Sequence, residues 1–307
     1  MNEKKKKFNI RNNLFVYSLI FYPLLLFIIF YIVQNFNSII LAFQRIDGFE
    51  KSFAWFDNFK DFLSEAFSDG AILNYSMRNS LIMYAVSLVI CIPLYILFAY
   101  LLFKKCIMHK FISFTVMVPQ IMSGMVTSLI FVQVLGSSGP TNWLFEALGI
   151  NGGEWFSLLW KENTAFATVI TYNIWLSFAM SLIMYPNAMR SINPEVLESA
   201  QIDGVNNMFQ ELWYIILPLI YPTLTTFFVT GVAAIFTNAG PLLELYYTNA
   251  PKYVYTAGYY FTRQILTDAT EFSYPKYAAG GLILTLVSTP ITLLVKWALE
   301  KFGPSEE

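Results

Sequence analysis

The sequence predicts an all-α polytopic membrane protein with six transmembrane helices. Hydrophobic residues make up 56% of the 307-residue chain and charged residues only 13%, whereas soluble domains are about one quarter charged. A helix needs roughly 20 apolar residues to cross the hydrocarbon layer of a bilayer. The chain contains six apolar runs of about this length, and a polar segment with a helix–turn–helix pattern separates the fourth from the fifth.

The apolar runs set the order of crossings and loops. They extend over Leu14–Ala42, Met77–Phe103, Phe111–Leu135, Ala165–Met189, Leu217–Thr237 and Tyr277–Leu299. The first run follows a basic tail but far exceeds the roughly 7–15 residues of a signal-peptide core, so we expect an uncleaved anchor. After it comes a predicted acidic loop, which holds Asp47, Glu50, Asp57, Asp61, Glu65 and Asp69.

Basic residues predict the orientation of the chain, because short cytoplasmic loops carry an excess of lysine and arginine. With both termini in the cytoplasm, 11 of the 19 basic residues lie inside. These are Lys4, Lys5, Lys6, Lys7, Arg11, Lys104, Lys105, Lys110, Arg190, Lys296 and Lys301. Six crossings and this orientation place the polar segment between the fourth and fifth runs in the cytoplasm.

The loop between the fifth and sixth runs is rich in tyrosine and would lie outside. Its tyrosines include Tyr246, Tyr247, Tyr253, Tyr255, Tyr259 and Tyr260. We interpret them as an aromatic belt at the membrane surface. Contact with a substrate-delivering protein is the alternative.

The sequence argues against several classes of function. A net charge of −1 without a concentrated basic face gives no indication of nucleic-acid binding. His109 is the only histidine, so no histidine-based triad or two-histidine metal site can form. No GxxxxGK[ST] phosphate loop occurs, so we expect no nucleotide site. We interpret Cys91 and Cys106 as small buried residues rather than a disulfide.

The polar segment has the signals of a short helix with a defined start and end. Asn193 is a natural N-cap, and Pro194 fits the first helical turn because its φ is already close to the helical value. Gly204 can stop or bend the helix. After it, Met208, Phe209, Leu212, Ile215 and Ile216 recur at helical spacing, which predicts an amphipathic stretch before Pro218 leads into the fifth run.

These residues resemble the signature of the membrane subunits of ATP-binding-cassette importers. That signature is Glu-Ala-Ala, two variable residues, Asp-Gly-Ala and a later Leu-Pro; here Ser199 and Val205 replace two alanines. The matching residues are Glu198, Ser199, Ala200, Asp203, Gly204, Val205, Leu217 and Pro218. GPTNWLFEALGI from Gly139, NIWLSF from Asn173 and NAGP from Asn238 resemble the carbohydrate-uptake, maltose-permease-like branch.

The resemblance implies a non-catalytic permease subunit in the bacterial cytoplasmic membrane. It implies a tail, first helix and acidic extracellular loop in 1–75, a permease core in 76–302 with a coupling loop at 187–217, and a cytoplasmic tail in 303–307. Glu198, Ser199, Ala200, Asp203 and Gly204 would form the coupling helix that docks into an ATPase. The implied partners are a second homologous permease, a dimer of ABC ATPase subunits that binds ATP and magnesium, and an extracellular solute-binding lipoprotein. This chain would bind no cofactor.

Polar residues in the apolar runs indicate a path for the solute, because polar groups in a membrane usually face protein or water. Asn173 and Ser177 lie four apart on one helix face, Trp175 lies on another face, and Thr237 and Asn238 end the fifth run. Similar positions in maltose-type permeases line the sugar site. For each residue, packing between helices is an alternative role.

Alternatives to a sugar importer remain open. An ATP-driven importer of a non-sugar solute would have a related loop. An ion-coupled secondary transporter or channel normally needs acidic residues or broken, repeated helices at mid-membrane, and no run has an acidic residue at its centre. A polytopic membrane enzyme would show clustered histidines or carboxylates at the interface, which a single histidine argues against.

Overall fold

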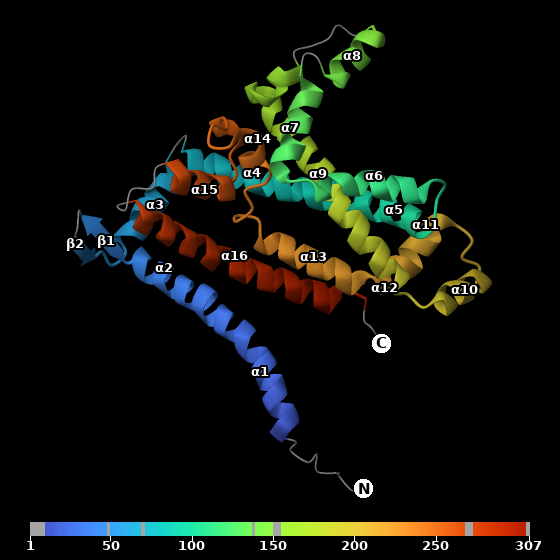
Figure 1. Cartoon of the computed structure of the whole chain (residues 1–307), viewed down its shortest axis with the longest axis horizontal. Coiled ribbons are helices and arrows are strands. Elements are labelled where there is room, and N and C mark those ends of the chain that lie inside the picture. The colour runs from blue at the N-terminus through green and yellow to red at the C-terminus, as the bar shows by residue number, and fades with distance from the viewer. Residues whose placement is uncertain are drawn as a thin grey trace. The chain divides into compact units, whose positions relative to one another are not determined.

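The structure, a computed structural model, describes residues 10–47, 50–68, 71–136, 139–149, 155–267 and 273–304. Contacts divide the chain into two compact units. The first comprises residues 1–64 and 269–283, and the second comprises residues 65–268 and 284–307. Helices dominate both units, as the sequence predicts (Figure 1).

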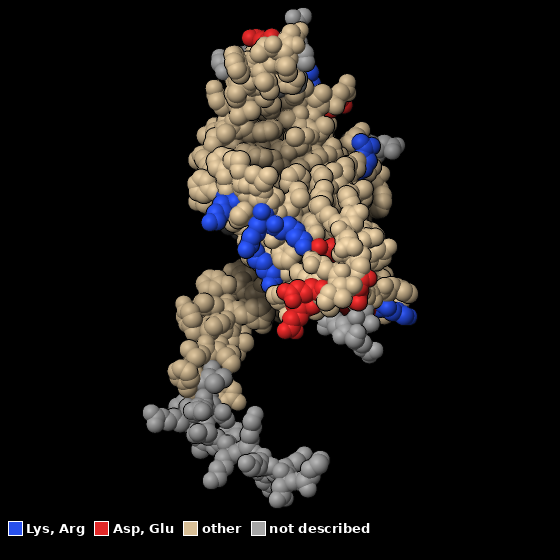
Figure 2. Space-filling model, turned by 90° about the vertical axis from the view of Figure 1, so that its right-hand side faces the viewer, with Lys and Arg blue, Asp and Glu red and all other residues tan. Residues whose placement is uncertain are grey.

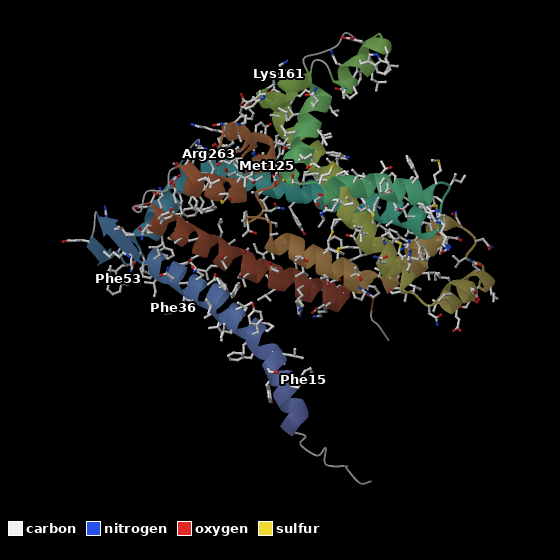
Figure 3. All side chains as sticks on the ribbon, viewed as in Figure 1. Phe15, Phe36, Phe53, Met125, Lys161 and Arg263 are labelled. Atoms are coloured by element: carbon white, nitrogen blue, oxygen red, sulfur yellow. The ribbon has the colours of Figure 1, made fainter. Side chains whose placement is uncertain are left out.

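The first unit begins with one long helical stretch. It consists of α1 (Ile10–Phe27), a π-helical segment (Ile28–Val33) and α2 (Gln34–Ala42). None of its most apolar 18 residues is buried, and Phe15 and Phe36 project away from the ribbon (Figure 3). A helix that is apolar all round and has little protein contact fits a lipid environment.

The predicted acidic loop is folded and contains a short β-hairpin, which the sequence did not indicate. Strands β1 (Gln44–Asp47) and β2 (Glu50–Phe53) pair antiparallel, with Gln44 opposite Phe53. Helix α3 (Asp57–Phe67) follows. The side-chain amide of Asn58 donates to the backbone carbonyls of Ala42 and Gln44, each at 2.8 Å, and so ties α3 to the end of α2. Asp69 lies outside the described residues.

The second unit holds most of the remaining helices. In chain order they are α4 (Ile72–Val86), a π segment (Ser87–Cys91), α5 (Ile92–Phe103), α6 (His109–Ile121), α7 (Gly124–Leu135), α8 (Pro140–Ala147), a 3₁₀ helix (Trp155–Leu159), α9 (Glu162–Arg190), α10 (Pro194–Ile202), α11 (Met208–Gln210), a π segment (Glu211–Ile216), α12 (Leu217–Leu219), α13 (Tyr221–Ala233), α14 (Leu242–Tyr246), a 3₁₀ helix (Lys252–Val254) and α15 (Ala257–Thr267). Helix α16 (Tyr274–Phe302) runs through both units. The largest contacts join α5 to α9, where Ala99 and Met189 are fully buried.

Four helices in the described part of the chain are long and apolar enough to cross a membrane. They are Tyr17–Ala42, Ile72–Phe103, Glu162–Arg190 and Tyr274–Phe302. The third and fifth runs are each broken into a bent pair of helices, which gives up to six crossings if each pair counts as one. Six crossings and cytoplasmic termini therefore stay predictions.

The third run breaks at Met122 and Ser123, although its composition predicts an unbroken helix over Phe111–Leu135. Met122 has an extended backbone, and the hydroxyl of Ser123 accepts a hydrogen bond from the backbone N–H of Val126 at 3.4 Å. Ser123 thus caps a new helix, α7, instead of continuing α6.

The fifth run breaks at Ile220, between Met208–Leu219 and Tyr221–Ala233, which meet at 70°. Proline explains the break, because Pro222 has no N–H to donate to the preceding turn and its ring crowds the carbonyl four residues earlier. Helix α13 also ends at Ala233 rather than at Thr237. Asn238 lies in a turn beyond it, where its side-chain oxygen accepts from the N–H of Gly240 at 2.8 Å.

Four of the six named tyrosines in the loop after α13 pack inside the protein and so cannot belong to the aromatic belt that the sequence favours, whereas Tyr247 is 59% exposed. Tyr246, Tyr255, Tyr259 and Tyr260 are buried. Tyr246 donates to the carbonyl of Leu159 at 2.7 Å, and Tyr259 donates to that of Tyr247 at 2.7 Å. Burial raises the pKa of Tyr246 above its ordinary value, so the hydroxyl stays protonated and keeps this hydrogen bond.

Candidate functional site

Helix α10 forms as the sequence predicts at both of its ends. The side-chain oxygen of Asn193 accepts from the N–H of Glu195 at 3.1 Å, and Pro194 occupies the first turn. At the other end, the backbone N–H of Val205 donates to the carbonyl of Ala200 at 3.0 Å, and the N–H of Gly204 donates to the carbonyl of Gln201 at 3.2 Å. These two hydrogen bonds form a Schellman motif at the C-terminus of α10. The motif requires a left-handed backbone at Gly204, whose φ is +96°.

The five predicted coupling residues divide between the two faces of α10. Ala200 is buried, and Leu197 packs against the hydrophobic core of the second unit. Glu198, Ser199, Asp203 and Gly204 are exposed, and so is Ile202, with 87% of its surface accessible. The helix therefore presents an acidic edge and a large apolar side chain to a potential partner.

Charges gather at the end of the molecule that carries α10. Figure 2 shows acidic side chains grouped beside basic ones on this face. Glu195 and Glu198 lie on α10 and Asp203 directly follows it, and no lysine or arginine occurs in residues 191–251. Basic residues near the ends of α5, α6 and α9 are Lys104, Lys105, Lys110 and Arg190.

The chain after α10 returns to the core through a second capped helix. The side-chain oxygen of Asn207 accepts from the N–H of Phe209 at 3.2 Å. The predicted amphipathic stretch follows, with Leu212 and Ile216 buried and Phe209 exposed. Two of its apolar residues thus join the core, whereas Phe209 extends the exposed apolar surface near α10.

A polar cavity of about 190 Å³ lies between α4, α9 and α13. Three of the five predicted pathway residues, Asn173, Ser177 and Asn238, line it. Its other lining residues are Ser80, Met83, Tyr84, Ser87, Ile92, Phe227, Phe228, Gly231, Ala234, Ile235 and Thr256. The cavity combines hydroxyl and amide groups with aromatic rings, and none of the described residues that line it is charged.

The other two predicted pathway residues lie outside the lining of this cavity. The ring of Trp175 packs against Phe131, with centroids 6.4 Å apart, and against Tyr172 at 5.9 Å. Thr237 is exposed, and its hydroxyl donates to the carbonyl of Ala234 at 3.4 Å. Their part in solute passage stays a prediction.

Sequence reasoning did not single out Ser80, Ser87 or Thr256, which also line the cavity. Ser80 and Ser87 are seven residues apart in the second apolar run, a spacing of two helical turns that could have indicated a common face. Thr256 gave no such signal, because it lies in a loop far along the chain.

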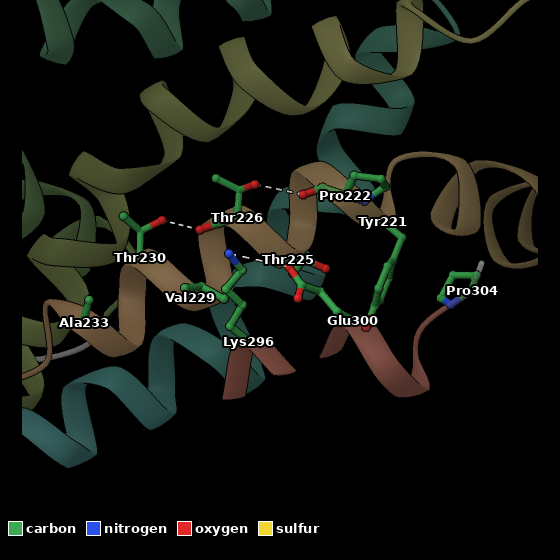
Figure 4. A pocket seen from close by; sticks show the side chains of 10 residues that line it. All are labelled: Tyr221, Pro222, Thr225, Thr226, Val229, Thr230, Ala233, Lys296, Glu300 and Pro304. Carbon is green, nitrogen blue, oxygen red and sulfur yellow. Dashed lines mark hydrogen bonds and ion pairs between the residues drawn. The ribbon is translucent and has the colours of Figure 1, made fainter. Parts of the chain in front are cut away.

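A larger cavity of about 830 Å³ lies on the opposite side of α13 and faces the last turns of α16 (Figure 4). Thr225, Thr226 and Thr230 line it, together with the ion pair between Lys296 and Glu300, whose charged atoms are 3.7 Å apart. Thr226 and Thr230 donate to the carbonyls of Pro222 and Thr226. None of the predicted site residues lines this cavity.

Replacing Gly258 by alanine is expected to displace the turn that carries Asn238. A Cβ at Gly258 would lie 2.5 Å from the carbonyl oxygen of Thr237 and 2.5 Å from the backbone carbon of Asn238, closer than atoms can pack. Strain in a packed site costs about 1–3 kcal/mol, so a thermal-shift measurement in detergent should show a lower melting temperature. Gly281→Ala is the control, because nothing lies within 4 Å of its added Cβ; equal melting temperatures would contradict the prediction.

Comparison with known proteins decides the family. Residues 70–304 match the family described as "Binding-protein-dependent transport system inner membrane component". The chain belongs to this family. As a member of it, the chain is a membrane-embedded permease subunit, in agreement with the apolar helices of the structure.

Individual relatives of this permease are sugar transport proteins. It is 27% identical to the polygalacturonan/rhamnogalacturonan transport system permease protein YteP of Bacillus subtilis (strain 168), over 74% of this chain and 70% of the relative. It is also 27% identical to the multiple sugar-binding transport system permease protein MsmF of Streptococcus mutans, over 73% of this chain and 74% of the relative. A chain of the bacterial alginate ABC transporter, crystallised with an alginate pentasaccharide-bound periplasmic protein, has the same fold, with a TM-score of 0.78, 24% identity and coverage of 97% of this chain and 98% of that one.

Proposed function

We propose that this permease forms half of the translocation pore of an ATP-driven importer for oligosaccharides. The observation that carries the proposal is the family match over residues 70–304, which includes a capped, exposed helix α10 in the position expected of a coupling helix. The similarity to permeases for polygalacturonan, rhamnogalacturonan and multiple sugars favours a saccharide over another solute.

In this proposal α10 docks into a groove of a separate ATPase. Its exposed acidic edge, Glu198 and Asp203, favours a groove with basic side chains, because charge-assisted hydrogen bonds are the stronger ones. Ile202 would supply an apolar contact at the centre of the interface. ATP binding would close the ATPase dimer, α10 would transmit the closure, and the pore would alternate between its two openings.

The cavity lined by Asn173, Ser177 and Asn238 is the proposed solute contact of this subunit. Its amides and hydroxyls can hydrogen-bond sugar hydroxyls, and Phe227 and Phe228 can pack on the apolar face of a pyranose ring. Because the described residues that line the cavity carry no charge, we infer that this subunit contacts a neutral part of the saccharide.

The complete importer would contain more chains than this one. We propose a second homologous permease, a dimer of ABC ATPase subunits that binds ATP and magnesium, and an extracellular solute-binding lipoprotein, all at the bacterial cytoplasmic membrane. The coupling end of this chain would then face the cytoplasm, and the tyrosine-rich loop would face the solute-binding protein.

Purification of the assembly tests this function directly. The full-length chain, carrying an affinity tag and extracted from its own membranes in mild detergent, should retain an ATPase with a phosphate-binding loop and a second permease. Saccharides presented on the purified binding protein should stimulate ATP hydrolysis by this assembly. An assembly without an ATPase, or stimulation by amino acids or peptides but by no glycan, would contradict the proposal.

A further inference from the structure

An ion pair joins the segment after the coupling helix to the end of α5. The ammonium nitrogen of Lys104 lies 2.5 Å from a carboxylate oxygen of Glu211. Lys104 caps the C-terminus of α5, and Glu211 opens the π segment Glu211–Ile216. The two residues are distant in the chain, so the pair is a tertiary link between two helical segments.

The surroundings of this pair make it costly to separate. Glu211 is only 9% exposed, and a buried carboxylate without a counter-charge is strongly unfavourable. Tyr100, one turn earlier on α5, lines the same cavity as Glu211, and the Lys104 nitrogen lies 5.8 Å from the centre of the Tyr100 ring. The carboxylate is therefore held at α5 by Lys104, and the two segments are expected to move together.

The pair spans a gap that side chains do not fill. A cavity of about 340 Å³ lies between Gln201, Val205 and Asn207 on the coupling side and Tyr100, Leu101 and Cys106 on the α5 side. Lys104 and Glu211 belong to its lining as well. Since packing is incomplete at this point, the charged contact is well placed to carry force from one wall of the cavity to the other.

The two segments joined by the Lys104–Glu211 ion pair lead to the two proposed sites, the coupling helix α10 and the polar cavity. On one side, Glu211 lies nine residues after Ile202, the last residue of α10, and Asn207 caps the short helix between them. On the other side, α5 continues through the π segment Ser87–Cys91 into α4. Ser80 and Ser87 of that stretch line the polar cavity with Asn173. π-Helical segments in α-helices frequently occur at functional sites.

We propose that Lys104 and Glu211 are positioning residues that transmit movement of α10 through α5 and α4 to the solute cavity. The proposal rests on the coupling role of α10 in the proposed function. Movement of α10 would thus reach the core by two routes, through the ion pair to α5 and along the chain itself to α13. The proposal assigns a mechanical role to two residues outside the importer signature.

Charge reversal separates this role from simple stability. Lys104→Glu or Glu211→Lys alone should lower binding-protein-stimulated ATP hydrolysis of the purified assembly about tenfold, within the range of coupling energies between contacting charges. The ATPase should still co-purify. The double variant, which restores an ion pair with reversed polarity, should recover stimulation. Lys105→Glu is the matched control, since it makes the same charge change on an exposed neighbour and should leave stimulation unchanged.

Spin labels give a readout that does not depend on the transported solute. With Cys91 and Cys106 replaced by serine, labels are placed at Ile107 and at Val196 of α10, which are 91% and 40% exposed. In the wild-type background the ion pair makes the two segments move together, so the distance between these labels should stay the same when ATP and magnesium close the ATPase. In Glu211→Lys, or in Glu211→Gln if the reversal prevents insertion, this distance should change on closure.

The outcomes separate this inference from the proposed function. Failure of the wild-type assembly to bind any ATPase would overturn the proposed function itself. Normal stimulation in both single reversals, or an unchanged label distance in the Glu211 variants, would overturn the inference and leave the proposed function standing. Loss of stimulation that the double variant does not recover would also overturn it.

Discussion

Replacing Gly204 by tryptophan is expected to abolish ATP-driven uptake while the permease still inserts into the membrane. Gly204 has φ +96°, and nothing lies within 4 Å of an added Cβ. The first atom of the new side chain would therefore meet no atom of this chain, and the indole ring would project from the end of α10 toward the proposed ATPase groove. Clashes at the centre of an interface cost about 2 kcal/mol or more, which corresponds to roughly a 30-fold loss of coupling.

The control for this substitution is a glycine with the same backbone and a different location. Gly149, which follows α8, has φ +73° and also has nothing within 4 Å of an added Cβ. Gly149→Trp therefore imposes a comparable strain of about 1–2 kcal/mol away from α10, and it should retain uptake. Uptake and membrane content are measured together for both variants. Normal uptake by a well-expressed Gly204→Trp variant would refute the coupling role.

Replacing Asn173 by leucine is expected to give the second large effect, on the solute rather than on the ATPase. Leucine has nearly the shape of asparagine but can form no hydrogen bond, so a sugar hydroxyl in the cavity would lose its partner. A buried polar group left unpaired costs about 1–3 kcal/mol, which predicts roughly a 10- to 100-fold loss of uptake. ATPase co-purification should stay at the wild-type level.

A second asparagine of the same helix provides the comparison. Asn187 is exposed near the other end of α9, where it accepts a hydrogen bond from Arg190 at 3.2 Å, and it does not line the polar cavity. Asn187→Leu should transport normally in the same uptake assay with a radiolabelled neutral oligosaccharide. If the two leucine variants transport equally well, the cavity is not the solute contact.

Local signals account for the parts of the site that the sequence predicts well. The start of α10 depends on Asn193 and Pro194 and its end on Gly204, all within a few residues of the bonds they make. Asn173 and Ser177 share a face because helical spacing places residues four apart on one side. Capping and periodicity of this kind can be read from the chain without knowledge of the tertiary fold.

Long-range contacts account for most of what the sequence did not predict. Ser80 accepts a hydrogen bond from the N–H of Ala257 at 2.9 Å, and Lys104 pairs with Glu211. Nothing near any of these residues in the chain indicates its partner. The breaks at Ser123 and Ile220 were missed for a different reason, because apolar composition predicts that a run enters the membrane and does not predict that it is continuous.

Because the chain bends by 70° at Ile220, the segment before α13 can act as a lever arm that rotates α13 about the bend. Sliding of that arm would become a tilt of α13, which has 13 residues and is therefore about 20 Å long. A tilt of about 10° about the bend would swing the far end of a helix of that length by about 3 Å. That is roughly the width of a water molecule, so in the proposed function a small movement at one side of the bilayer would be enough to open or close a passage at the other.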